Sequence, residues 1–288
     1  MKYEITGTTK LTALLGSPVS HSISPQMHNE SFRLLGLDYV YLAFDIKPEQ
    51  LREAVSGLKT AGISGFNLTM PLKVHILPYL DELTPAASLA GAVNTVIVQD
   101  GRLIGHTTDG VGYMRSVSDA GFDIIGKKMT LLGAGGAATA ICVQAALDGV
   151  SSIDMFKRKN ATWDKTAAFC ERVASETGCN IRLLDIGDNS LLGDSISGSA
   201  ILTNATSVGM EPKSDASPIL DPYMLAEGLI VSDIIYNPRE TLLMKQAKER
   251  GCPCFNGMYM LLYQGAAAFE CWTGQEMPTD IIKEKYFS

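Results

Sequence analysis

Short apolar stretches rich in β-branched residues alternate along the chain with stretches whose apolar residues recur at helical spacing. The apolar stretches predict strands at residues 11–15, 39–44, 65–68, 93–98, 129–132, 153–156, 181–184, 200–203 and 229–235. Helical spacing is found at residues 48–60, 111–120, 137–148, 165–177 and 258–273. Parallel neighbouring strands need such crossovers between them. The pattern therefore predicts an α/β fold with mostly parallel sheets.

The pattern also divides the chain into two units. Residues 1–108 form one α/β unit, and a boundary is expected near Asp109. A second unit begins at Lys127 with an apolar strand that runs straight into a glycine-rich turn. That arrangement is typical of a Rossmann-type dinucleotide-binding domain. The helical stretch after Met258 fits either unit on its pattern alone.

Composition narrows the class of protein. The net charge of −7 argues against a nucleic-acid binder, because phosphate binding usually needs a basic surface. No run approaches the ~20 apolar residues of a membrane helix, and the N-terminus does not resemble a signal peptide. We therefore expect a cytoplasmic protein with a small-molecule substrate and no membrane partner. The spacing of the 6 cysteines and 4 histidines fits no metal site, so none is predicted.

The glycine-rich turn directly follows a predicted strand and opens a predicted helix. Gly133, Gly135 and Ala138 fit the pattern G-x-G-x-x-G/A. The first glycine makes the tight turn, the second lets the backbone approach a pyrophosphate, and the small third residue lets helix and strand pack closely. Amides at the helix start then point at the phosphate. We predict dinucleotide binding here; the alternative is a tight turn without a ligand.

The second strand of such a domain normally ends in an acidic residue that binds the ribose hydroxyls of NAD. Here the strand ends in Lys157-Arg158-Lys159-Asn160, and Asp154 comes too early, inside the strand. Cations bind phosphate oxygens well, so this tip suits the 2′-phosphate of NADP. The alternative is a solvated basic turn.

A short loop after the first strand carries two hydroxyls, Ser22 and Ser24, followed by Pro25, which is suited to start a helix. Hydroxyls and helix-start amides together make a site for a carboxylate. Taken alone, the same string would be an ordinary helix cap.

Two further polar strings lie in the first unit. A strand delivers Asn67 and Thr69 to a turn, with Lys73 just beyond, and Asp109 sits among glycines that let a ligand come close. Asp109 could equally form an Asx turn. Interconversion of a hydroxyl and a ketone needs a hydride acceptor and a group that moves the hydroxyl proton. A Lys–Asp pair can move the proton, because the carboxylate orients the ammonium.

These strings, in this order, resemble those of the shikimate dehydrogenase family, and the resemblance covers nearly the whole chain. Any one string is modest evidence, whereas the ordered set is highly specific. The set is Ser22-x-Ser24-Pro25, Asn67-x-Thr69-x-Pro71-x-Lys73, Gly91-Ala92-Val93-Asn94-Thr95, Thr108-Asp109-Gly110-x-Gly112, Gly133-Ala134-Gly135-Gly136, Asn204-Ala205-Thr206-Ser207-x-Gly209-Met210, Tyr236-Asn237-Pro238 and Gly257-x-x-Met260-Leu261-x-x-Gln264-Gly265.

The resemblance implies an oxidoreductase that interconverts 3-dehydroshikimate and shikimate with NADP or NAD. It implies a substrate domain of residues 1–108 with 258–288, a Rossmann-type cofactor domain of residues 109–257, and Lys73 and Asp109 as the catalytic pair. The candidate substrate contacts are Ser22, Ser24, Asn67, Thr69, Asn94, Tyr236 and Gln264. The candidate cofactor contacts are Gly133, Ala134, Gly135, Gly136, Ala137, Lys157, Arg158, Asn160, Asn204, Thr206, Met210 and Gly257.

Two positions depart from the family pattern. The family usually has Asn where Thr107 stands, and its NADP-specific members carry a second Arg where Thr162 stands. Arg158 is kept, and Asn160 could bond ribose hydroxyls without repelling a phosphate. We therefore expect use of both NAD and NADP.

Three questions stay open at the level of sequence. Quinate is a candidate second substrate, and an aminated ring analogue would need similar contacts. A non-catalytic ligand sensor on the same scaffold is the alternative to an enzyme, because function resides in the site rather than in the fold. A homodimer is common in such enzymes, but no residue pattern here establishes one.

Overall fold

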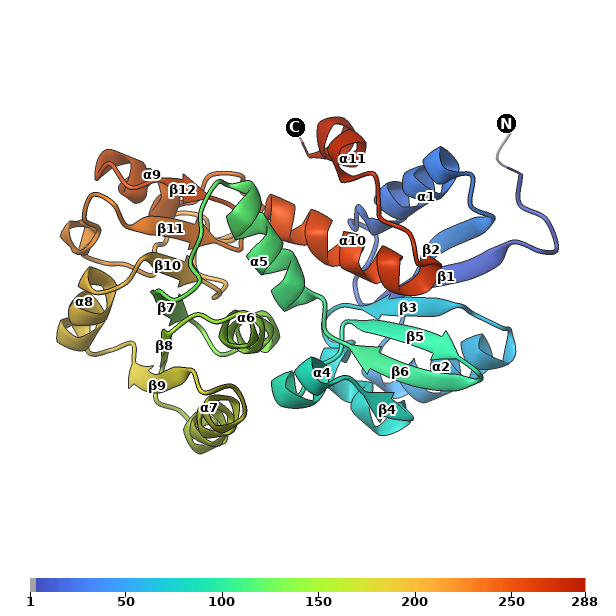
Figure 1. The fold of residues 1–288 in the computed structure, drawn as a ribbon, viewed down its shortest axis with the longest axis horizontal. Coiled ribbons are helices and arrows are strands. Elements are labelled where there is room, and N and C mark those ends of the chain that lie inside the picture. Colours follow the sequence, from blue (N-terminus) through green and yellow to red (C-terminus); the bar gives the residue numbers. More distant parts are fainter. Residues whose placement is uncertain (1–3, 288) are drawn as a thin grey trace. The chain divides into compact units, whose positions relative to one another are not determined.

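The computed structural model describes residues 4–287. The chain divides into two compact units, one formed by Met1–Gly112 with Leu262–Ser288 and the other by Tyr113–Leu261. Each unit is built on a six-stranded sheet flanked by helices (Figure 1). Within residues 4–287, no helix combines the length and the apolar character needed to cross a membrane.

The sheet of the first unit has the strand order β2-β1-β3-β5-β6-β4. Strand β1 pairs in parallel with β2 and β3, and β4 pairs in parallel with β6, whereas β5 runs antiparallel to both β3 and β6. The strands are β1 (Lys10–Gly16), β2 (Tyr39–Asp45), β3 (Gly65–Leu68), β4 (Glu82–Leu83), β5 (Thr95–Gln99) and β6 (Arg102–His106).

Helices of the first unit begin and end at residues suited to those positions. Helix α1 has a proline in its first turn and stops at Gly36, whose φ of 65° only glycine adopts readily. The side chain of Thr84 caps α4 by accepting from the amide of Ala87. The helices are α1 (Ser24–Leu35), α2 (Leu51–Thr60), α3 (Leu72–His75), α4 (Pro85–Ala90) and α11 (Thr279–Tyr286), with 3-10 turns at Pro48–Gln50 and Leu77–Tyr79.

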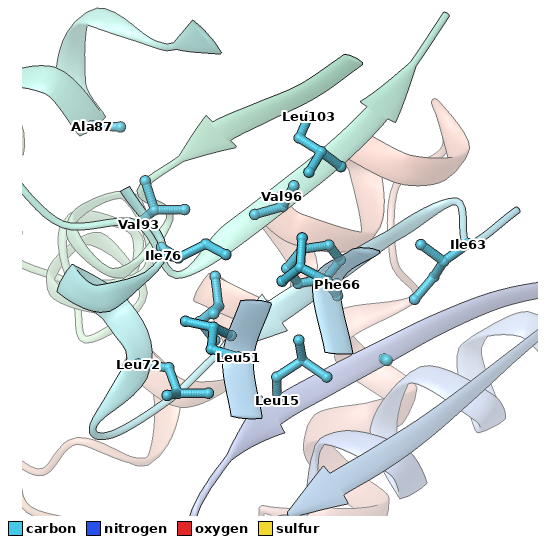
Figure 2. Close-up of a cluster of buried hydrophobic side chains, with 13 residues drawn as sticks. Leu15, Leu51, Ile63, Phe66, Leu72, Ile76, Ala87, Val93, Val96 and Leu103 are labelled. Atoms are coloured by element: carbon cyan, nitrogen blue, oxygen red, sulfur yellow. The ribbon is translucent and has the colours of Figure 1, made fainter. Parts of the chain in front are cut away.

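One hydrophobic cluster of the first unit lies on one face of its sheet. Apolar side chains of β1, β3 and β5 pack there against those of α2 and α3, as Figure 2 shows. Phe66, Leu51 and Ile76 are fully buried in this cluster. Burying a side chain of this size contributes about 2 kcal/mol. The cluster holds the sheet rigid beneath the polar strand ends described below.

The second unit is a parallel sheet with the strand order β12-β11-β10-β7-β8-β9. Counted from β7, this is the doubly wound order of a dinucleotide-binding domain. The strands are β7 (Lys128–Leu132), β8 (Ser152–Lys157), β9 (Asn180–Asp185), β10 (Ile201–Asn204), β11 (Ile230–Asp233) and β12 (Cys254–Phe255). The helices are α6 (Gly136–Leu147), α7 (Trp163–Thr177), α8 (Asn189–Ser197) and α9 (Leu242–Glu249), with a 3-10 turn at Pro222–Met224.

Two helices contain the points where the chain passes from one unit to the other. They are α5 (Asp109–Asp119) and α10 (Met258–Thr273). As a result, Asp109 belongs to the first unit although most of α5 lies in the second. Gln264 belongs to the first unit as well.

The predicted α/β class with mostly parallel sheets is confirmed, with differences in detail. The strand predicted at 93–98 begins at Thr95, and the hairpin partner β6 was not predicted. Strands β4 and β12 were also missed, because two residues are too few to produce a pattern. The hairpin makes part of the first sheet antiparallel, and this places the start of β5 beside the end of β6.

Candidate active site

Four polar segments meet at the end of the first sheet where the parallel strands β1 and β3 have their carboxyl ends; below, this end is called the polar edge. Leu15 pairs with Leu68, Asn67 pairs with Thr95, and Thr95 pairs with His106. The loop after β1, the turn after β3, the start of β5 and the end of β6 therefore lie together. Because β5 is antiparallel, its beginning rather than its end contributes to this edge.

Lys73 and Asp109 form an ion pair at this edge. Nζ of Lys73 donates to Oδ2 of Asp109 over 2.5 Å. The Lys73 side chain is 24% exposed, whereas that of Asp109 is only 9% exposed. The ammonium can therefore reach a ligand while the carboxylate behind it stays shielded from water. A shielded carboxylate orients a partner more strongly than an exposed one, because water screens it less.

Asn94 holds the carboxylate of Asp109 in place. Its Nδ2 donates to Oδ1 of Asp109 over 2.9 Å, and its Oδ1 accepts from the backbone amide of Thr108 over 2.7 Å. Nδ2 also lies 3.3 Å from Oε1 of Gln264, which α10 contributes. Asn94 is 2% exposed, so its amide is fixed by these contacts. The structure thus brings together Lys73, Asp109, Asn94 and Gln264.

The serine loop and the β3 turn contribute the remaining polar groups of the first unit. Oγ of Ser22 accepts from the amide of Ser24 over 3.3 Å, at the first turn of α1. Thr69 is half-buried, and its amide donates to the carbonyl of Leu15, which ties the β3 turn to the end of β1.

The Asn67 side chain differs from its neighbours because it bonds within the protein. It is 5% exposed, and its Nδ2 donates to Oγ1 of Thr95 over 3.0 Å and to the carbonyl of Asn94 over 3.1 Å. Its Oδ1 accepts from the hydroxyl of Tyr41 over 2.8 Å. The sequence gives no site role to Tyr41 or Thr95, because both look like ordinary strand residues.

In the second unit, the glycine-rich turn leaves an open surface at the start of α6. Gly133 has a φ of 111°, and a Cβ there would lie 2.7 Å from the carbonyl oxygen of Ala205, so only glycine fits. Gly135 and Gly136 are different: within the described chain, no other heavy atom lies within 4 Å of a Cβ added to either. No side chain of residues 4–287 caps this helix. Its first amides therefore suit an anion such as a pyrophosphate.

The tip of β8 presents two of its three basic side chains to solvent and buries the third. Lys157 is 8% exposed, and its Nζ donates to Oγ1 of Thr162 over 2.6 Å and to Oγ1 of Thr166 over 3.1 Å. Oδ1 of Asn160 accepts from the amide of Thr162 over 3.1 Å. Arg158 and Lys159 are exposed, and the Lys159 ammonium lies over the Trp163 ring. The exposed Arg158 is therefore open to a ligand, whereas two hydroxyls already bond Lys157.

Asp154, set aside above as too early in its strand, is a structural residue. It is 1% exposed and accepts from Arg182 through both carboxylate oxygens, at 2.7 Å each. Lys128 and Ser195 also bond it. These partners outweigh the effect of burial and lower its pKa to about 2.

The other candidate residues of the second unit follow β10 and β11. Asn204 is buried, and its Oδ1 accepts from Oγ1 of Thr206 over 2.7 Å, which shapes the loop after β10. Met210 and Tyr236 are exposed, by 42% and 43% respectively. A Cβ on Gly257 would collide with the backbone carbonyl of Ile234, so the chain passes very close to itself there. Tyr236 is thus the one predicted substrate residue that lies in the second unit.

Comparison with known proteins agrees with this geometry. Residues 14–96 match the family model for the shikimate dehydrogenase substrate binding domain, and residues 257–285 match that for the shikimate 5′-dehydrogenase C-terminal domain. The chain is 52% identical over 283 residues to shikimate dehydrogenase (NADP(+)) of Listeria monocytogenes serotype 4b (strain F2365), covering 98% of this chain and 97% of the relative.

Solved structures of shikimate dehydrogenases are also similar to this chain. The crystal structure of shikimate 5-dehydrogenase from Listeria monocytogenes, in complex with shikimate and NAD, matches with a TM-score of 0.95 at 51% identity and covers 99% of this chain and 98% of that one. A shikimate dehydrogenase in complex with NADP+ matches with a TM-score of 0.88 at 39% identity, over 98% and 96% of the two chains. This chain therefore belongs to the shikimate dehydrogenase family.

Proposed function

We propose that this chain is a shikimate dehydrogenase, which interconverts shikimate and 3-dehydroshikimate with a nicotinamide cofactor. The observation that carries the proposal is the Lys73–Asp109 ion pair, held by Asn94 at a polar edge of the first sheet. The 52% identity to a relative named shikimate dehydrogenase (NADP(+)) supports the same substrate. An intact pair of this kind favours an enzyme over a ligand sensor.

The division of labour follows the two units. We assign substrate binding to residues 1–108 with 258–288, and cofactor binding to residues 109–257. The compact units Met1–Gly112 with Leu262–Ser288, and Tyr113–Leu261, support this division. The doubly wound order of the second sheet supports the cofactor assignment.

In the reaction, the nicotinamide cofactor supplies or accepts the hydride. Lys73 moves the proton at the reacting ring oxygen: its ammonium donates during ketone reduction, and the amine accepts during alcohol oxidation. Asp109 orients the ammonium and balances its charge. Asn94 keeps the carboxylate of Asp109 turned toward Lys73.

Substrate recognition is assigned to the polar groups around this pair. The hydroxyls of Ser22 and Ser24, with Tyr236, bind the ring carboxylate. Thr69, Asn94 and Gln264 bind ring hydroxyls, and the free lone pair of the Asn67 carbonyl oxygen accepts from another. The position of Ser24 in the first turn of α1 supports its role, because helix-start amides favour a negative charge.

The cofactor is assigned to the turn after β7. The open surface at Gly135 and Gly136 suits the pyrophosphate, with Gly133, Ala134 and Ala137 beside it. Asn204, Thr206 and Met210 are assigned to positions along the cofactor, and Gly257 to a position near the nicotinamide. At the adenosine half, Arg158 is the exposed cation for a 2′-phosphate, while Lys157 and Asn160 shape the loop that carries it.

We propose that NADP and NAD are both accepted. The exposed Arg158 gives a modest preference for phosphate, and Asn160 adds no negative charge to repel it. A relative named for NADP(+) and a similar structure that holds NAD support both cofactors. Quinate, which carries one more ring hydroxyl than shikimate, is the proposed second substrate.

Initial rates with shikimate or quinate, each with NAD+ or NADP+, test the proposal. The expected result is reduction of the nicotinamide with shikimate and both cofactors, faster with NADP+. Rates measured with an aminated ring analogue under the same conditions show whether the enzyme prefers that analogue to shikimate. Folded protein that reduces neither cofactor with shikimate would contradict the proposed function.

A further inference from the structure

Two neighbouring residues of α1, Asn29 and His28, contact Tyr41 inside the first unit. Tyr41 is fully buried on β2, the edge strand of its sheet. Its backbone amide donates to Oδ1 of Asn29 over 2.8 Å, and its carbonyl accepts from Nδ2 of the same side chain over 2.8 Å. The next residue back on α1, His28, stacks on the Tyr41 ring with 4.4 Å between ring centroids. The phenol is therefore presented in one fixed position.

The phenol hydroxyl bonds a residue assigned to the substrate. It donates to Oδ1 of Asn67 over 2.8 Å. Burial raises the pKa of Tyr41, so the hydroxyl keeps its proton at neutral pH and remains a donor. Asn67 belongs to the proposed ring-hydroxyl end of the site.

The bonds from Tyr41 and to the Asn94 carbonyl together set how the Asn67 amide is turned. Both hydrogens of Nδ2 are used, on Thr95 and on the carbonyl of Asn94. If the amide turned over, its NH₂ group would face the phenol, and its oxygen would face a carbonyl that cannot donate. The Asn94 carbonyl therefore keeps the amide oxygen of Asn67 on the Tyr41 side, and the phenol holds that oxygen in place while leaving its second lone pair open.

A continuous series of buried side-chain hydrogen bonds leads from Tyr41 to the ion pair. From Asn67 it passes to Oγ1 of Thr95, which lies 3.0 Å from Oγ1 of Thr108. Nδ2 of Asn94 donates to Thr108 and to Asp109, both over 2.9 Å. Since buried polar groups need partners, a change at one end of such a series alters the others.

We propose that Tyr41 is a positioning residue of the substrate site: its phenol fixes the Asn67 side chain and anchors the hydrogen-bond series that ends at Asp109. This inference rests on the proposed function, because Asn67 is a substrate contact only in that account. Phenylalanine at position 41 would keep the stacking with His28 but would lack the hydroxyl that donates to Asn67.

The test compares Tyr41→Phe with Tyr39→Phe. Tyr39 is a matched control on the same strand, 8% exposed, and its hydroxyl bonds the carbonyl of Trp272 outside the series. Two quantities are measured in each variant and in the wild type. The first measurement is steady-state kinetics, which gives kcat, the KM for shikimate and the KM for NADP+. The other is the position of the Asn67 side-chain amide signals in a nitrogen–proton NMR spectrum, assigned by their loss in Asn67→Asp.

The proposal predicts that Tyr41→Phe raises the KM for shikimate on the order of 10-fold, the effect of leaving one buried partner unsatisfied. The KM for NADP+ should change less than about twofold, and the Asn67 signals should shift only in Tyr41→Phe. Unchanged Asn67 signals, or the same shikimate KM as in Tyr39→Phe, would overturn it. If the wild type does not turn over shikimate, the proposed function fails, and the NMR comparison still decides whether Tyr41 positions Asn67.

Discussion

Replacing His28 with phenylalanine should remove a marked loss of stability in mild acid. His28 is fully buried on α1, stacked against Tyr41 and within 6.1 Å, centroid to centroid, of the Phe269 ring. Neither of its ring nitrogens has a hydrogen-bond partner in residues 4–287. Burial therefore lowers the pKa of His28 to about 3.

The size of the effect follows from the two pKa values. The unfolded chain has the ordinary histidine pKa of 6.5, so it takes up a proton below that pH while the folded chain does not. Stability is fully present above pH 6.5, falls as the pH drops, and falls no further below about 3. Each pH unit in this window costs about 1.4 kcal/mol. Between pH 7 and pH 5, His28 alone should lower the free energy of unfolding by about 2 kcal/mol.

Urea denaturation at pH 7 and pH 5 measures this difference. Burial also lowers the pKa of His106, but that residue contributes equally to wild type and variant. The pKa of Glu30 is lowered to about 2, so its contribution is lost only below the range tested. Overpacking by the larger ring changes stability at both pH values and cancels in the comparison; His28→Leu is a second variant if phenylalanine does not fit. A wild type and variant with the same pH dependence would refute the reasoning.

Two further predictions concern the cofactor unit. Arg158→Ala should weaken NADP+ binding on the order of 10-fold and leave NAD+ binding nearly unchanged. Lys157→Met should change the ratio of the NADP+ and NAD+ affinities less than about threefold; equal effects of the two substitutions, measured by calorimetry, would show that Lys157 also binds the phosphate. Gly133→Ala should destabilise the protein by about 2 kcal/mol or more because its Cβ meets the Ala205 carbonyl. Gly136→Ala should weaken cofactor binding while leaving the thermal midpoint equal or higher, and a comparable loss of stability in both would refute this account.

Hydrophobic patterning predicted most of the fold because its elements are long or strongly periodic. The strand at 65–68 and the helix at 258–273 were predicted with the bounds that the structure has. Strand β6 was missed because only Leu103 and Ile104 are apolar in it. The hairpin turn before it carried a signal: Asp100 and Gly101 both have positive φ, and Asp-Gly is a typical sequence for such turns.

Contacts within the site were harder to predict than its residues. The ordered strings identified Lys73 and Asp109, but nothing near Tyr41 in the sequence shows that its phenol bonds Asn67, because that contact is purely tertiary. At the basic tip of β8, by contrast, residues that are close in sequence do not share a contact. Its cations are adjacent in sequence, yet Lys157 is the last strand residue and turns inward, whereas Arg158 beyond it is exposed. Side chains of successive residues alternate in direction along a strand, so adjacent charges need not share a ligand.

The central claim is that the Lys73–Asp109 pair performs the proton transfer of shikimate oxidation. The most direct measurement is kcat for NADP+-dependent shikimate oxidation by the wild type, Lys73→Ala and Lys59→Ala. Lys59 is a matched control, because it also pairs with an aspartate of the first unit, Asp81, at 3.3 Å and in an exposed position. We predict that Lys73→Ala lowers kcat by about 100-fold or more, the usual scale of acid–base catalysis, and that Lys59→Ala changes it less than about twofold. A Lys73→Ala enzyme that keeps wild-type turnover would contradict the account.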